Sequence, residues 1–150
     1  MPLADAPFMA DILSASKATD WNSYGNQLGT AISTYLESGD ATTIQGPGTL
    51  ITTGVAAFQS ALDEASSATM WDDYAEQFSS ATVDLISSSQ VIIPGWGVGS
   101  IAVTGGEEYT SGLKDMYASG ATWTIQVTVL KNLVKTLITS SVTSPSGSIS

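Results

Sequence analysis

Apolar side chains recur along this chain with a seven-residue spacing, which places them on one face of an α-helix. The spacing occurs in three sets: Trp21, Leu28 and Tyr35; Trp71, Phe78 and Leu85; Trp123, Leu130 and Leu137. It predicts three helices of about eighteen residues each, ending near Gly39, Ser88 and Ser140. We expect these Trp, Tyr and Leu stripes to form the core, with Trp21 and Trp71 packed in equivalent ways.

A shorter helix is predicted ahead of each long one. The pattern that predicts it is an aromatic residue followed four positions later by an aliphatic one: Phe8 and Ile12, Phe58 and Leu62, Tyr109 and Leu113. Thr19 and Thr69 stand between the paired helices, and their hydroxyl groups suit the N-cap position. Each unit is therefore predicted to be a helical hairpin.

The units are copies of one another. Residues around Trp21 align with those around Trp71, 50 positions later, over about thirty residues without a gap, and a diverged third copy surrounds Trp123. The predicted fold class is all-α: three tandem helical hairpins with a period of about 50 residues. We divide the single domain into repeat 1 (1–43), connector and repeat 2 (44–90), and connector, repeat 3 and tail (91–150).

The connectors are rich in Pro and Gly, at 45–50 and 93–99, and are predicted to be turns with minor extended segments. Residues 91–93 and 101–103 are β-prone. Segment 142–149 resembles a third connector with no hairpin after it. It could dock on a neighbouring subunit or form a frayed polar tail. Residues 122–129 alternate like a strand, but the repeat alignment and the helical period of 131–138 favour a helix.

Charge and composition exclude several classes of function. The chain is 43% hydrophobic and 12% charged, with four lysines, no arginine and a net charge of −10. No cationic patch for nucleic acid can be built, and an anionic membrane surface is disfavoured. Without His or Cys, Ser-His-Asp and Cys-His catalysis and imidazole or thiolate metal sites are impossible. We expect no metal and no cofactor.

No signal peptide or transmembrane segment is recognised. The N-terminus lacks a basic region, and the most apolar stretch, 123–138, contains Lys131 and Lys135. A soluble intracellular protein, or a virion component, is the expectation. A membrane-active helix at 123–138 is a further hypothesis, for which we expect no support.

Candidate catalytic patterns are weak. Ser14–Lys17 and Ser111–Lys114 match S-x-x-K by chance in a serine-rich chain. The carboxylate groups at 63–64, 72–76 and 107–108 stand near predicted helix starts, where the helix dipole accounts for them. The 95–99 segment lacks the spacing of a phosphate loop. The protein is predicted not to be an enzyme.

Candidate interface residues are clearer. Trp96 lies between Gly95 and Gly97 in the second connector, and we favour an exposed interface residue over a ring packed on its own hairpins. The tail from Pro145 to Ile149 is a second candidate. Lys131 and Lys135, one helical turn apart, are expected to meet acids of another repeat, such as Asp72 or Asp73, or of another chain.

This profile of a small, acidic chain rich in Ser, Thr and Gly resembles tailed-bacteriophage virion components, such as capsid-associated, neck or baseplate proteins. The resemblance implies a non-enzymatic assembly subunit whose partners are other protein subunits, including itself. The alternative is a small adaptor in which the third hairpin recognises a peptide or helix. The sequence does not identify the host, the copy number or the position in a particle.

Overall fold

The computed structural model describes residues 2–150 and shows three repeats of a helical hairpin followed by a β-hairpin. Repeat 1 contains α1 (Asp5–Ala15), α2 (Trp21–Ser38), β1 (Asp40–Thr43) and β2 (Gly46–Ile51). Repeat 2 contains α3 (Val55–Ala65), α4 (Trp71–Ser87), β3 (Gln90–Ile93) and β4 (Gly97–Ala102). Repeat 3 contains α5 (Gly106–Ala118), α6 (Trp123–Thr139), β5 (Val142–Ser144) and β6 (Gly147–Ile149).

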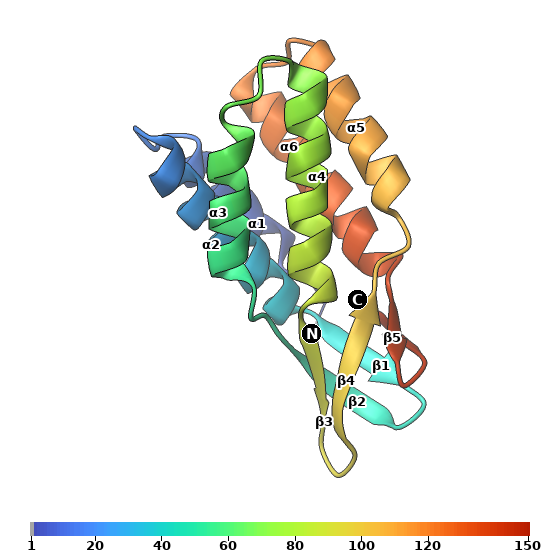
Figure 1. Cartoon of the computed structure of the whole chain (residues 1–150). Coiled ribbons are helices and arrows are strands. Elements are labelled where there is room, and N and C mark those ends of the chain that lie inside the picture. The colour runs from blue at the N-terminus through green and yellow to red at the C-terminus, as the bar shows by residue number, and fades with distance from the viewer. Residues whose placement is uncertain (1) are drawn as a thin grey trace.

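The repeats form two layers (Figure 1). In one layer, each helix packs against the next in chain order and α6 returns to α1, which closes a ring of six helices. In the other layer, six antiparallel strands form a closed barrel in chain order, with β6 paired to β1. The all-α prediction is therefore wrong. The Pro/Gly-rich connectors and the C-terminal segment form β-hairpins, which together build the barrel layer. Closure of the barrel leaves no strand edge unpaired.

The long helices begin where the repeat predicts, but with different caps. Asp20 is the N-cap of α2, and its carboxylate accepts a hydrogen bond from the Ser23 N–H at 2.7 Å. Met70 occupies the same position before α4 and makes no side-chain cap bond. The prediction that Thr19 and Thr69 are the caps is wrong by one residue. Residues 123–139 form α6, which confirms the helix over the strand.

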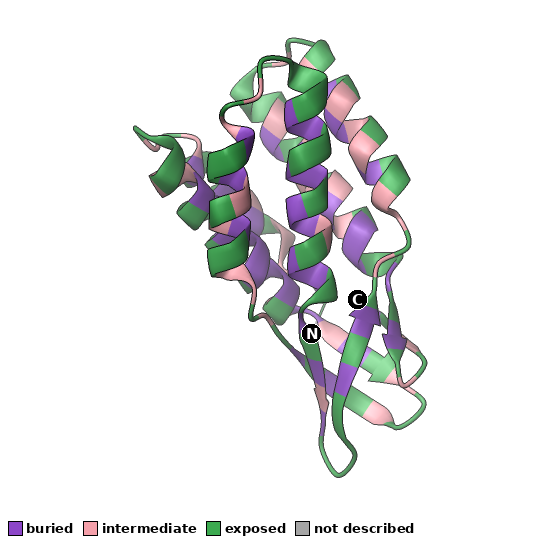
Figure 2. Cartoon of the chain, viewed as in Figure 1, coloured by how far each residue is buried: buried purple, intermediate pink, exposed green. Residues whose placement is uncertain are grey.

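The core of the helical layer lies inside the ring. Each helix turns its apolar face inward, as the burial colours of Figure 2 show. Phe8 stacks on Tyr35 with ring centroids 4.1 Å apart, and Phe58 meets Phe78 edge to face at 6.2 Å. These contacts join the short helix to the long helix in repeats 1 and 2. Tyr109 and Leu113 of repeat 3 are also buried, so the predicted aromatic-to-aliphatic pairs do mark buried faces.

The barrel interior alternates small and large side chains. Leu50, Ile101 and Ile149 are at most 4% exposed and fill its lumen. Two residues before each of them stands a glycine that faces the same way: Gly48, Gly99 and Gly147. At Gly99 an added methyl group would overlap the backbone carbonyl oxygen of Ser144 on β5. A six-stranded barrel is narrow, so its strands approach closely only where the side chain is absent.

The C-terminal segment forms the last two strands of the barrel. Val142–Ser144 pairs with β4, and Gly147–Ile149 pairs with β1, where Ile149 lies opposite Ala41. The Ser150 N–H donates to the Asp40 carbonyl at 3.0 Å and the return bond is 2.9 Å. The segment is thus the third β-hairpin, and it pairs with the first repeat of its own chain.

The close approach of Gly99 to the β5 backbone allows a test of the barrel packing. Gly99→Ala should lower the free energy of unfolding by about 2 kcal/mol, because the new methyl group meets fixed backbone. Urea denaturation followed by far-UV circular dichroism measures the loss. Ser100→Ala, on the outward face of the same strand, is the control and should change stability little. Equal effects of the two substitutions would contradict the barrel packing.

Candidate functional site

The three tryptophans at the start of the long helices gather at one end of the molecule. Trp21, Trp71 and Trp123 are the first residues of α2, α4 and α6, at the end of the helical layer away from the barrel. They are 45%, 60% and 53% exposed. The prediction that they are core residues is wrong, because the first turn of each long helix projects past the buried part of the ring.

An aromatic cavity of about 350 Å³ opens between them. We use "aromatic cavity" for the space lined by Ser16, Ala18, Thr19, Asp20, Trp21, Tyr24, Trp71, Tyr74, Tyr117 and Trp123. Ring contacts connect five of the six aromatic side chains. The centroid distances are 5.6 Å for Trp21–Tyr24, 5.7 Å for Trp21–Tyr74, 5.8 Å for Trp71–Tyr74 and 4.9 Å for the stacked Trp71–Tyr117 pair.

The sixth ring, Trp123, stands apart because the third repeat has diverged. The residue three positions after the tryptophan is Tyr24 in repeat 1 and Tyr74 in repeat 2, but Gln126 in repeat 3. The Gln126 amide donates to the Ala121 carbonyl at 2.8 Å and does not line the cavity. Helix α6 therefore contributes no tyrosine to the lining. Helix α5, two residues longer than α3, contributes Tyr117, which stacks on Trp71.

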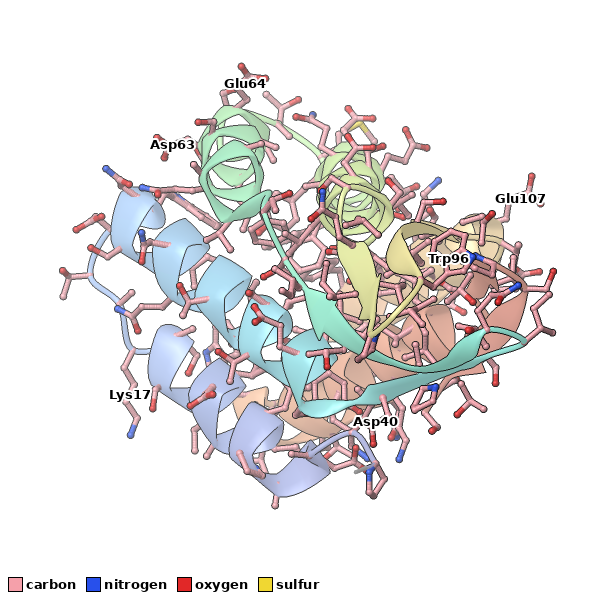
Figure 3. The ribbon with its side chains drawn as sticks, turned by 90° about the horizontal axis from the view of Figure 1, so that it is seen from below. Lys17, Asp40, Asp63, Glu64, Trp96 and Glu107 are labelled. Carbon is pink, nitrogen blue, oxygen red and sulfur yellow. The ribbon has the colours of Figure 1, made fainter. Side chains whose placement is uncertain are left out.

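The walls of the aromatic cavity are neutral except at one point. Burial raises the pKa of Tyr24 to about 12, and it raises the pKa of Tyr74 and Tyr117 further. All three phenols keep their protons at neutral pH. Asp20 is the one charged residue of the lining, and its carboxylate also caps α2. Lys17, three residues earlier, points outward from the ring (Figure 3).

The second S-x-x-K pattern does not present its lysine as a general base. Lys114 of the second S-x-x-K pattern donates to Glu76 at 2.8 Å, and this bond raises the pKa of its ammonium group. A lysine acting as a base needs the opposite shift. Asp63, Glu64 and Glu107 lie at the periphery of the helical layer (Figure 3). No group of three acidic residues within this range could hold a metal ion.

The predicted interface residue Trp96 lies at the opposite end of the molecule. It occupies the turn between β3 and β4, flanked by Gly95 with φ 81° and Gly97 with φ 133°, both in the left-handed region that glycine tolerates. We call this end the barrel tip and define it by Ile44, Trp96 and Val98, which are 77%, 48% and 57% exposed.

The predicted tail residues are divided between two environments. Pro145 is half-buried in the β5–β6 turn, where its carbonyl accepts a bond from the Thr143 hydroxyl at 2.7 Å. Ile149 is 2% exposed, inside the barrel. Pro145 therefore lies in a turn at the end of the barrel away from the helices, whereas the Ile149 side chain belongs to the core.

Lys131 and Lys135 lie at the seam where the helical ring closes. Lys135 donates to the Asp5 carboxylate at 2.8 Å, and the Lys131 ammonium is 3.8 Å from the same oxygen. The Tyr35 hydroxyl donates to the other oxygen at 2.7 Å. Both lysines meet an acid of another repeat, as expected, but the acid is Asp5 of the same chain and not Asp72 or Asp73.

Comparison with known proteins adds no family to this description: no protein-family model, no curated protein and no solved structure matches the chain. The class is therefore defined by its own architecture, a threefold-repeated helical ring on a closed six-stranded barrel. Within residues 2–150, none of the helices has the length and apolar character needed to cross a membrane.

The interactions of Asp5 where the helical ring closes predict how the free energy of unfolding depends on pH. The Lys135 and Tyr35 hydrogen bonds lower the pKa of Asp5 in the folded state. The stabilisation is therefore present above the ordinary pKa of Asp5 and is lost as pH falls through its lowered folded value. Asp5→Asn should cost about 1 kcal/mol at pH 7, a modest figure because the group is partly exposed to solvent.

Urea denaturation of both proteins at pH 7 and at pH 3 measures this effect. The difference between wild type and Asp5→Asn should shrink at the lower pH, where protonation removes the charge from Asp5 itself. Asp11→Asn, an exposed position on the same helix, is the control. An unchanged difference at the two pH values would contradict a role for the ionised carboxylate.

Proposed function

We propose that this protein is a non-enzymatic assembly subunit that contacts other subunits, including its own copies, through the barrel tip. The observation that carries the proposal is the set of apolar side chains exposed there: Ile44, Trp96 and Val98. Tryptophan is enriched among the residues that dominate binding energy at protein interfaces. Figure 1 shows the β3–β4 turn at the end of the molecule furthest from the helices.

Backbone hydrogen bonds hold the turns of the barrel tip, which favours binding. The Ile44 N–H donates to the Ser146 carbonyl at 3.0 Å, joining the first and third hairpin turns, and the Trp96 N–H donates to the Ile93 carbonyl at 3.0 Å. Because these turns are already ordered in the free protein, a partner would gain contact area with little loss of conformational entropy.

Charge also directs contacts toward this end. The chain carries a net charge of −10, so copies repel one another over most of their surfaces. The three hairpin turns, at residues 44–45, 94–96 and 145–146, contain no charged residue. An association through the barrel tip therefore brings neutral surfaces together and avoids close approach of the acidic helices.

The tailed-bacteriophage virion stays a hypothesis that rests on composition alone. The adaptor hypothesis gains no supporting observation. The third hairpin was expected to bind the peptide or helix, but five apolar side chains of its long helix are buried within the helical ring, at Val127, Leu130, Val134, Leu137 and Ile138, and Trp123 and Ile125 are the exposed ones. The assembly function is the one that the exposed barrel tip supports.

Removal of the Trp96 side chain tests the proposal. We expect the wild-type protein to form a defined oligomer in light scattering after size exclusion, and Trp96→Ala to weaken association at least about tenfold, as loss of an interface anchor does. Circular dichroism should be unchanged, since Trp96 is half-exposed. Leu13→Ala, which shortens an exposed apolar residue on α1, is the control and should assemble normally.

Two outcomes would contradict the proposal. A wild-type monomer at every accessible concentration would rule out self-association, and an oligomer unaffected by Trp96→Ala would place the contact elsewhere. Removal of residues 142–150 is not a clean probe, because it deletes β5 and β6 and opens the barrel.

A further inference from the structure

We propose that the aromatic cavity binds an organic cation with a methylated ammonium head group. This inference does not depend on the assembly function, since the cavity and the barrel tip lie at opposite ends of the molecule. It rests on three properties of the aromatic cavity: the nature of its walls, the sign of its single charge and the size of its empty space.

The walls are built from electron-rich rings. Trp21, Trp71 and Trp123 come from three different helices and all line the space, while Tyr24, Tyr74 and Tyr117 complete the lining. The face of an indole or phenol ring carries negative potential and attracts a cation, with tryptophan the strongest of the three aromatic side chains. Methylated ammonium groups suit such walls because they shed water more easily than a primary ammonium ion.

The charge of the aromatic cavity has the matching sign. Asp20 contributes the one ionised group of the lining, and no lysine lines it. Both carboxylate oxygens of Asp20 bond to Ser23, at 2.7 Å to its backbone N–H and 3.2 Å to its hydroxyl, which fixes the carboxylate in place. An anionic ligand would face this carboxylate, the ring faces and a chain of net charge −10.

The space is small, and the three repeats line it unequally. A volume of about 350 Å³ is near the lower limit for ligand sites in proteins, which span roughly 300–1,000 Å³. Repeat 3 has Gln126 where the other two repeats have a tyrosine that lines the cavity, so α6 contributes no tyrosine ring to this space. A tyrosine at this position would add a fourth tyrosine ring, after Tyr24, Tyr74 and Tyr117, and would fill part of the cavity.

Two sources could supply the same head group: a free small molecule such as choline, or a methylated lysine side chain on another protein. The tryptophans at the mouth are about half exposed, so the head group can enter from solvent in either form. The shared chemistry is a compact cation without N–H donors, held by ring faces.

Isothermal titration calorimetry of the full chain tests the inference with a matched pair of probes. Choline carries a trimethylammonium group, and 3,3-dimethyl-1-butanol is its uncharged isostere. We expect choline to bind about tenfold more tightly, because only the cation gains the cation–π attraction. Equal affinity for the two probes, or no detectable binding of choline at millimolar concentration, would overturn the proposal.

Three variants locate the site. Trp71→Leu should weaken choline binding about tenfold or more, and its exposed position makes loss of the fold unexpected. Gln126→Tyr should abolish binding by filling part of the cavity while leaving helix content unchanged. Trp96→Leu removes the tryptophan at the barrel tip, outside the aromatic cavity, and should bind choline as the wild type does. Binding that survives Trp71→Leu and Gln126→Tyr together would overturn the assignment.

A second titration separates the two sources. A short peptide with one trimethyl-lysine is compared with the same peptide carrying unmodified lysine and with choline. Tighter binding of the trimethylated peptide than of choline indicates a methylated protein partner, and the reverse order indicates a free small molecule. Preference for the unmodified peptide would overturn the proposal, because a primary ammonium ion is the more strongly hydrated group.

Discussion

Closure of the chain into a circle is the constraint on which the rest of this structure depends. The last strand pairs with the first, with Ile149 opposite Ala41, and the last helix packs on the first through Asp5 and Lys135. An isolated two-stranded hairpin is marginally stable in water. Each of the three hairpins is therefore stabilised by its two neighbours, and the pairing between β6 and β1 is what gives the terminal hairpins their second neighbour.

The two layers expose different side chains at the two ends of the molecule. In the barrel, narrowness requires glycine at positions such as Gly99 and leaves apolar turn residues facing outward at the tip. In the helical ring, the first turns of the long helices project beyond the core and expose three tryptophans. The barrel tip, with uncharged turns, thus lies at one end of the molecule, and the aromatic cavity lies at the other. Each end suits a separate binding role.

Divergence of the third repeat is what distinguishes this molecule from an ideal threefold ring. Gln126 replaces a phenol ring with an amide that turns back to its own backbone, and the longer α5 adds Tyr117 to the wall. The changes that weaken the sequence repeat therefore also change the lining of the aromatic cavity, to which α6 contributes no tyrosine and α5 contributes Tyr117.

The sequence by itself determined the repeat and the pairing of short and long helices, and it favoured a helix over 123–139 and an exposed Trp96. These are local properties, set by side-chain period and by the glycines around a turn. Only the tertiary structure decided that segments such as 46–51 and 142–149 are strands of one barrel, because their partners lie in other repeats. It also decided that Trp21, Trp71 and Trp123 surround a cavity instead of filling a core. Helical period places a residue on a face, but whether that face is covered at its end depends on where the neighbouring helices stop.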